Sequence, residues 1–110
     1  MPGMSEVPEI QAADVSPQAF LLDVREPNEW AAGHAVGAVH IPMGEVPARL
    51  AELPDREITV ICKSGGRSAQ VTEFLLARGH QAVNLAGGTT AWQAVGRPMA
   101  AETAAEPFVL

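Results

Sequence analysis

The single cysteine of this 110-residue chain, Cys62, is followed by residues suited to activating a thiol. Gly65 and Gly66 allow the backbone to curl tightly, so that several peptide N–H groups point toward a sulfur or a bound anion. Lys63 and Arg67 add positive charge, which favours the thiolate, the nucleophilic form of cysteine. An arginine also holds two oxygens of an oxyanion at once. We therefore predict a nucleophilic Cys62 in an anion-binding loop made of Lys63, Ser64, Gly65, Gly66, Arg67 and Ser68.

The elements around this loop alternate between strands and helices. Strands are predicted over 20–24, 38–41, 57–62 and 82–85, with a candidate edge strand over 9–11. Helices are predicted over 26–33, 46–53, 67–78 and 89–95. This order predicts an α/β fold of three layers, a mainly parallel sheet of four or five strands with helices on both faces. Active sites of such sheets lie at the carboxyl ends of the strands, and Cys62 ends the strand predicted over 57–62.

Two further expectations concern the core. Val71, Phe74 and Leu75 fall on one face of the helix predicted over 67–78, so we expect Phe74 and Leu75 to be buried. Val60 and Ile61 are expected in a central strand, because their strand is the richest in β-branched residues.

The net charge of the chain limits the classes of partner that the protein is expected to bind. The chain has 13 acidic residues against 7 Lys and Arg, a formal net charge of −6, with a pI near 4.9. General binding to nucleic acid or to an anionic membrane surface needs a basic surface and is not expected. No apolar run approaches the roughly 20 residues of a membrane span, and the first residues do not resemble a signal peptide. We therefore expect a cytoplasmic protein. Residues 58–101 nevertheless carry four bases and one acid, which suits an anion near Cys62.

A set of motifs in a fixed order runs along the chain. The loop fits the pattern Cys-x-x-Gly-x-Arg-Ser with Cys62, Gly65, Arg67 and Ser68 in place. The other motif segments, in chain order, are Leu22-Asp-Val-Arg-Glu26, Glu29-Trp30, Gly33-His34, Gly37-Ala38, Ile41-Pro42, Gly79, Val83-Asn-Leu85, Gly87-Gly88, Trp92 and Gly96-x-Pro98. With this ordered set the chain resembles the single-domain rhodaneses, which are sulfurtransferases. The resemblance covers about residues 5–99, leaving 1–4 and 100–110 as termini expected to be loosely structured.

The resemblance implies a rhodanese-like fold and a mechanism. Cys62 would be the catalytic residue, attacking the outer sulfur of a donor such as thiosulfate to form a persulfide. A thiol or cyanide acceptor would then remove that sulfur, and a protein is a further candidate acceptor. Residues 63–68 would bind the substrate. The family needs no metal and no organic cofactor for this reaction.

Two readings of the family remain open beside the enzyme. In one, the protein is a sulfur carrier whose Cys62 is loaded by a partner protein. In the other, it is a rhodanese-like binding module, although such modules usually lose the cysteine. Thiosulfate turnover by the purified protein alone separates both from the enzyme.

Other kinds of site fit the sequence less well. Cysteine phosphatases and arsenate reductases place five residues between Cys and Arg, whereas this loop has four, 63–66, and encloses a smaller pocket. A phosphate-binding P-loop would end in Gly-Lys-Ser or Gly-Lys-Thr, which is absent. One cysteine cannot form an internal disulfide, and the three histidines have no zinc-site spacing. Asp23 and Arg25 are expected to support the loops at the end of the sheet through hydrogen bonds rather than to act in catalysis.

Overall fold

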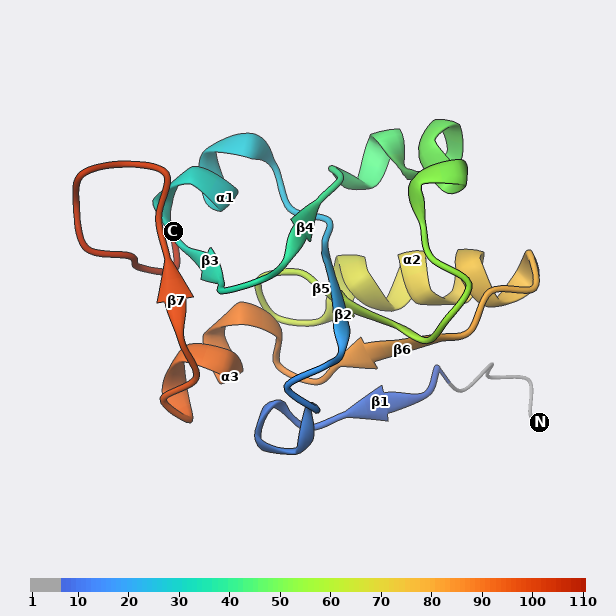
Figure 1. Cartoon of the computed structure of the whole chain (residues 1–110), viewed down its shortest axis with the longest axis horizontal. Helices are drawn as coiled ribbons and strands as arrows, with labels where there is room; N and C mark the ends of the chain where they lie inside the picture. The colour runs from blue at the N-terminus through green and yellow to red at the C-terminus, as the bar shows by residue number, and fades with distance from the viewer. Residues whose placement is uncertain (1–6) are drawn as a thin grey trace.

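Five parallel strands form the main sheet of the computed structural model, which describes residues 7–110 (Figure 1). The expected start of the domain at residue 5 and the expected loose terminus 1–4 lie outside the described residues. The strand order is β1-β6-β5-β2-β4, which places β5 in the centre. The strands are β1 (Glu9–Ile10), β2 (Phe20–Asp23), β4 (Val39–His40), β5 (Ile58–Ile61) and β6 (Ala82–Leu85). The predicted mainly parallel sheet, with Val60 and Ile61 in a central strand, is confirmed.

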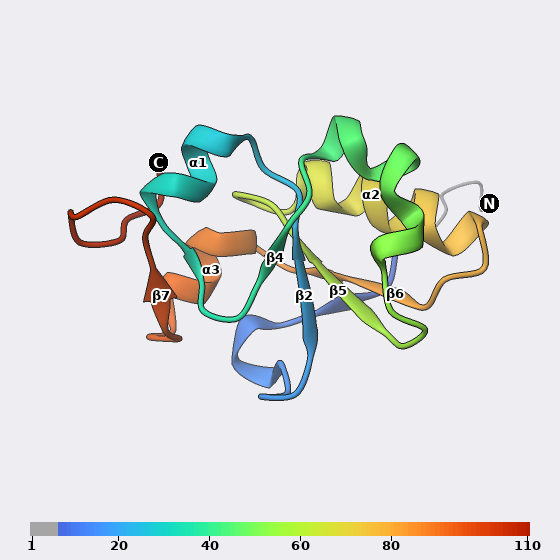
Figure 2. The ribbon, with the colours of Figure 1, turned by 45° about the horizontal axis from the view of Figure 1, so that its top comes forward.

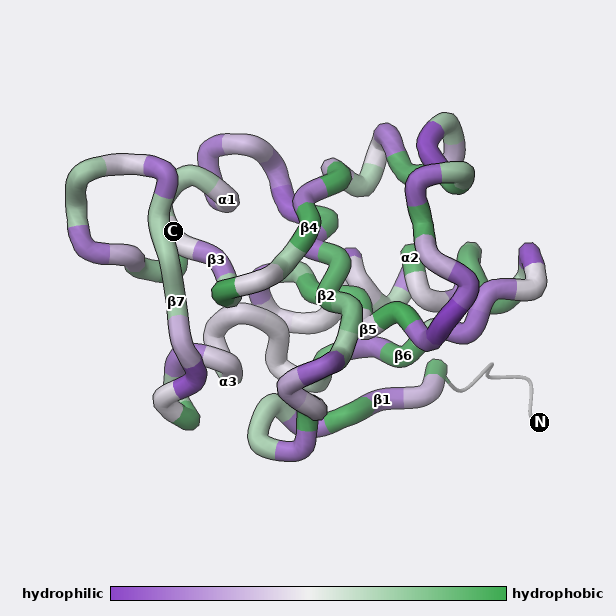
Figure 3. Tube along the Cα trace, viewed as in Figure 1, coloured by the Kyte–Doolittle hydropathy of each residue, from purple (hydrophilic) through white to green (hydrophobic). Residues whose placement is uncertain are grey.

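The central strands are buried on both faces because helices cover both sides. Every residue of β5 and β6 is buried. Neighbouring residues of one strand enter opposite cores: Leu22 packs in one cluster and Leu21 in the other. This alternation is the two-residue period of a strand. Figure 3 shows that β2 and β5 themselves are hydrophobic along most of their length.

The covering helices divide between the two faces. The main α-helices are α1 (Pro27–Ala32), α2 (Gly66–Ala77) and α3 (Gly88–Ala94), and the 3-10 helices are η1 (Ala12–Asp14) and η2 (Met43–Glu52). Elements η2 and α2 cover one face, and α3 with η1 covers the other (Figure 2). The three-layer α/β fold expected from the sequence is therefore confirmed. No helix within residues 7–110 is long and apolar enough to cross a membrane.

Several local predictions differ from the structure. The helix predicted over 46–53 is a run of 3-10 turns, because Pro47 lies inside it and Arg49 has non-helical backbone angles. Leu75 is buried as predicted, but Phe74 is only half-buried, with the Arg78 guanidinium 3.7 Å from its ring centroid. Two short strands, β3 (His34–Ala35) and β7 (Met99–Ala100), pair antiparallel and were not predicted.

The C-terminal segment is attached to α1. Residues 101–110 form no helix or strand, yet the Glu102 N–H donates to the Ala31 carbonyl at 3.0 Å. The Phe108 N–H donates to the Ala32 carbonyl at the same distance. Ala100 pairs with His34 in the small sheet. The tail expected to be loosely structured over 100–110 is thus anchored at three points.

Candidate active site

The loop after β5 surrounds the Cys62 sulfur with hydrogen-bond donors. Cys62 is 1% exposed and lies at the carboxyl end of the central strand. The Gly65 N–H donates to Cys62 Sγ at 3.0 Å. Gly65 has a φ of 111°, a conformation that favours glycine, and it is the N-cap residue immediately before α2. The tight curl predicted from the two glycines therefore aims a peptide N–H at the sulfur.

The start of α3 holds the same loop from the other side. The Thr89 N–H donates to the Cys62 carbonyl at 2.8 Å, and the Thr90 N–H donates to the Lys63 carbonyl at 3.1 Å. This close approach requires Gly88, because a Cβ there would overlap both carbonyl oxygens. The sequence analysis placed Gly88 only in a matching family segment, since its contact with residues 25 and 26 positions earlier has no local signal.

Ser68 supplies a second donor group. Its side chain is fully buried in the first turn of α2, with Oγ 3.2 Å from Cys62 Sγ. The structure therefore brings Cys62, Gly65 and Ser68 together.

The pKa of Cys62 is lowered below its ordinary value. Burial alone raises this pKa, because it disfavours the charged thiolate. Hydrogen bonds from the Ser68 hydroxyl and from the backbone of Ser68, Gly65 and Ser64 outweigh that effect. The expected acidic thiol thus owes its stabilisation to uncharged donors, whereas the sequence also credited Lys63 and Arg67.

Arg67 makes an ion pair across the loop. Its Nη1 and Nη2 donate to the two carboxylate oxygens of Glu29, at 2.8 and 2.9 Å. These hydrogen bonds lower the pKa of Glu29 to about 2 and raise that of Arg67. The Cys62 charge adds only a smaller part to the raised pKa of Arg67. Sequence reasoning placed Glu29 only in the segment Glu29-Trp30 and missed it as a partner of Arg67, because it lies 38 positions away.

The remaining loop residues lie at the surface. Lys63, Ser64 and Gly66 are exposed, although the Ser64 backbone still donates a hydrogen bond to the Cys62 sulfur.

The comparisons with known proteins agree with this geometry. Residues 6–95 match the family described as "Rhodanese-like domain". The chain belongs to this family. It is 38% identical over 100 residues to "Putative sulfurtransferase YtwF" of Bacillus subtilis, covering 84% of this chain and 97% of that protein. It is 40% identical over 84 residues to a "Sulfurtransferase" of Allochromatium vinosum, covering 74% and 78%.

Two further similarities support the family and the fold. The chain is 38% identical over 96 residues to "Putative sulfur carrier protein YrkF" of Bacillus subtilis, covering 80% of this chain and 52% of that protein. The crystal structure of a rhodanese-related protein from Thermoplasma volcanium superimposes with a TM-score of 0.79 and 35% identity, covering 84% of this chain and 97% of that one. The rhodanese-like fold expected from the resemblance is confirmed.

In this rhodanese-like chain, Asp23 and Arg25 form a buried pair at the carboxyl end of β2. Arg25 Nη2 donates to Asp23 Oδ2 and to the Gly33 carbonyl, both at 2.8 Å. Asp23 lies beside Ile61 in the sheet, so the pair sits at the same edge as Cys62. These contacts tie β2 to the end of α1.

Trp30 lies between two imidazole rings beside this pair. Its ring stacks on His34 with centroids 3.5 Å apart and on His40 at 4.8 Å. His34 Nδ1 is 2.8 Å from the Trp30 carbonyl, so His34 closes the last turn of α1. Within residues 7–110, no three His, Cys, Asp or Glu side chains gather as a metal site.

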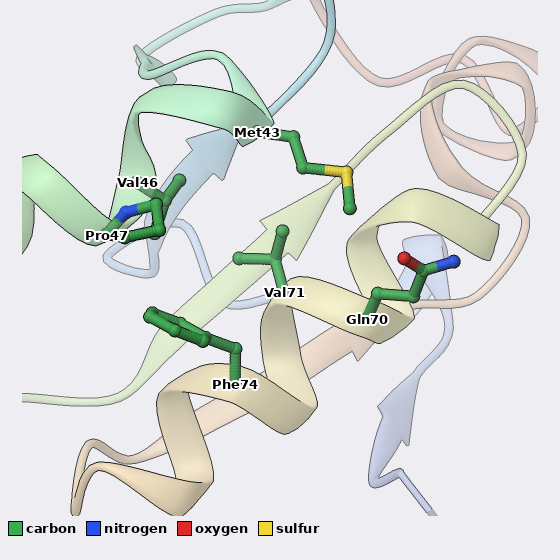
Figure 4. Close-up of a pocket in the computed structure, with 6 residues that line it drawn as sticks. All are labelled: Met43, Val46, Pro47, Gln70, Val71 and Phe74. Carbon is green, nitrogen blue, oxygen red and sulfur yellow. The ribbon is translucent and has the colours of Figure 1, made fainter.

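An apolar pocket of about 210 Å³ opens between η2 and α2 (Figure 4). Two of its residues, Val46 and Val71, belong to the same core cluster as Cys62. Its lining residues are Met43, Val46, Pro47, Gln70, Val71 and Phe74.

Proposed function

We propose that the protein transfers sulfane sulfur from thiosulfate, or from another donor, to a thiol or cyanide through a persulfide on Cys62. The observation that carries the proposal is the environment of Cys62 Sγ. A peptide N–H lies 3.0 Å from the sulfur and the Ser68 hydroxyl 3.2 Å away, and the pKa of the thiol is lowered. A thiolate is the form that attacks sulfur.

The reaction proceeds in two displacements. The Cys62 thiolate attacks the outer sulfur of thiosulfate, the S–S bond breaks, and its electron pair leaves with sulfite. The persulfide now carries the negative charge on its outer sulfur. Cyanide or an acceptor thiolate attacks that outer sulfur, which regenerates the Cys62 thiolate and releases thiocyanate or a new persulfide. Neither displacement requires a metal or an organic cofactor.

The loop residues supply the anion binding in this proposal. The positive end of α2 begins at Gly66, and Lys63 is exposed beside the approach to the sulfur. Arg67 contributes charge next to Cys62, although both of its terminal nitrogens are held by Glu29. Residues 63–68 therefore bind the donor mainly through peptide N–H groups and Lys63.

A sulfur carrier is the second candidate. The similarity to a protein named as a sulfur carrier favours it, and the same buried thiol would hold the persulfide. A carrier differs from the enzyme in its donor, because a partner protein would load Cys62. A module that only docks partners has no use for a thiol of lowered pKa, which disfavours that third reading.

Steady-state thiosulfate:cyanide assays on the purified protein test the proposal. The enzyme produces thiocyanate over many turnovers with no other protein present, and the Cys62→Ser variant produces none. A folded protein that takes up no sulfur from thiosulfate and shows no turnover would favour a carrier whose Cys62 is loaded by a partner protein. Activity that survives in Cys62→Ser would remove Cys62 from the mechanism.

A further inference from the structure

Ser68 has one hydroxyl proton and two acceptors within reach. Its Oγ lies 3.2 Å from Cys62 Sγ and 2.5 Å from Asn84 Oδ1, and both neighbouring side chains are buried. A hydroxyl group donates a single hydrogen bond, so Ser68 donates to the sulfur or to Asn84 but not to both. Because two oxygens at 2.5 Å repel without a proton between them, the Ser68 proton lies toward Asn84 in the arrangement observed.

The orientation of the Asn84 amide follows from its other neighbours. Asn84 Nδ2 lies 3.1 Å from Glu9 Oε2 and 3.1 Å from the Gly65 carbonyl. Both of these groups accept hydrogen bonds, so they require the NH₂ side of the amide. The carbonyl side is therefore left to face Ser68. Strand pairing fixes this geometry, since Asn84 of β6 lies beside Glu9 of β1.

The proton of Ser68 therefore responds to the state of Cys62. When Sγ carries a proton, the S–H donates to Ser68 Oγ and Ser68 donates to Asn84, so both contacts are hydrogen bonds. When Sγ is a thiolate, it has no proton to give, and Ser68 must turn toward it. Asn84 Oδ1 then loses its donor in a buried site, which is costly.

We propose that Asn84 is a positioning residue that competes with Cys62 Sγ for the Ser68 proton, so that Ser68 donates to sulfur only in the thiolate. A thiolate held less tightly is a stronger nucleophile, because nucleophilicity rises as the thiolate becomes more basic. The next step rests on the proposed persulfide chemistry: the same change of hydrogen-bond partner by Ser68 favours formation of the Cys62 persulfide. Once Sγ bonds to the transferred sulfur it loses its charge, and the Ser68 hydroxyl turns back to donate its hydrogen bond to Asn84.

A double-mutant cycle on the titration of Cys62 tests this competition. The rate of alkylation by iodoacetamide is measured against pH for the unaltered protein, Asn84→Ala, Ser68→Ala and the double variant. Asn84→Ala also removes the contact to Gly65, but it does so equally whether residue 68 is Ser or Ala. The charges of Lys63, Glu9 and the Arg67–Glu29 pair likewise act on Cys62 equally in both backgrounds. The difference between the two shifts in the Cys62 titration midpoint therefore measures the coupling of Asn84 and Ser68 through the shared proton.

With Ser68 present, Asn84→Ala shifts the midpoint to lower pH, relative to its effect in the Ser68→Ala background, by about 0.5–1 unit. Equal shifts in the two backgrounds, or a relative shift upward, would overturn the proposal. Asn84→Val gives the same cycle with a residue suited to a strand should Asn84→Ala not fold, and thermal unfolding monitors folding of every variant. Alkylation requires no sulfur transfer, so the cycle remains decisive even if thiosulfate turnover is absent.

Discussion

The guanidinium of Arg67 and the carboxylate of Glu29 face each other in a two-pronged ion pair, with N–O distances of 2.8 and 2.9 Å. The pair joins the first turn of α2 to α1, so it links the cysteine loop to a segment that precedes it by more than 30 residues. Glu29 also accepts a hydrogen bond from the Glu26 N–H at 2.9 Å, which fixes its carboxylate. Arg67 is therefore both a charge near the sulfur and a brace for the loop.

Glu29→Gln is expected to destabilise the protein in a pH-dependent way. The pKa of Glu29 is lowered from 4.5 to about 2, so its stabilisation is present above about pH 4.5 and is lost as the pH falls toward 2. We expect a loss of about 1–2 kcal/mol at pH 6, after allowance for solvent screening at Arg67, which is about one-third exposed. Urea unfolding at pH 6 and pH 3 checks this. The gap between the two proteins should shrink by half or more at pH 3, and an unchanged gap would rule out the ion pair as its cause.

Arg67 and Lys63 are expected to act differently in catalysis. Arg67→Ala removes the loop brace and leaves Glu29 negative and mostly buried beside an anion site, so kcat/KM should fall roughly ten- to a hundredfold. Lys63→Ala should lower kcat/KM less, mainly through KM, and its effect should weaken with salt because Lys63 is exposed. Thiosulfate:cyanide kinetics at low and high salt measure both.

A matched control for the Arg67 and Lys63 variants lies at the far end of α2. Arg78→Ala removes the same kind of charge from an exposed position over the Phe74 ring, and it should leave kcat/KM within about twofold. A severe loss for Lys63→Ala beside a near-neutral Arg67→Ala would reverse the assignment of roles.

Gly88 and Gly79 offer a test of the contact between α3 and the loop. Both have positive φ, 59° and 87°, so alanine costs about 1–2 kcal/mol of backbone strain at either position. A Cβ at Gly79 meets nothing within 4 Å, whereas one at Gly88 would overlap the Cys62 and Lys63 carbonyl oxygens. Gly88→Ala should therefore lower Tm by more than Gly79→Ala, and only Gly88→Ala should slow alkylation of Cys62. Similar losses of Tm in the two variants would mean that the cysteine loop moves away from residue 88 without any loss of stability.

Sequence reasoning reached the parts of this molecule that depend on local patterns. The apolar runs of β2 and β5 and the position of Cys62 at a strand end follow from hydrophobic spacing and strand propensity. The curl at Gly65 follows from two glycines before a helix. These features need no knowledge of which distant segments meet.

The features that sequence reasoning did not predict are contacts between distant segments. Glu29 with Arg67, and Asn84 with Ser68, join residues 38 and 16 positions apart, and neither spacing has a period that marks it. The pairing of β3 with β7 joins strands of only two residues each, which are too short to show alternation. The pKa of Cys62 followed the predicted direction, but its cause lay in peptide and hydroxyl donors that only the folded loop brings together.

The central claim, that Cys62 carries the transferred sulfur, is tested most directly by the intact mass of the protein after incubation with thiosulfate. We predict a gain of one sulfur atom per chain that a reductant removes, and no gain in Cys62→Ser. Because Cys62 is the only thiol, the adduct has a single possible thiol site. A sulfur adduct on Cys62→Ser, or no adduct on a folded unaltered protein whose thiol still alkylates, would contradict the account.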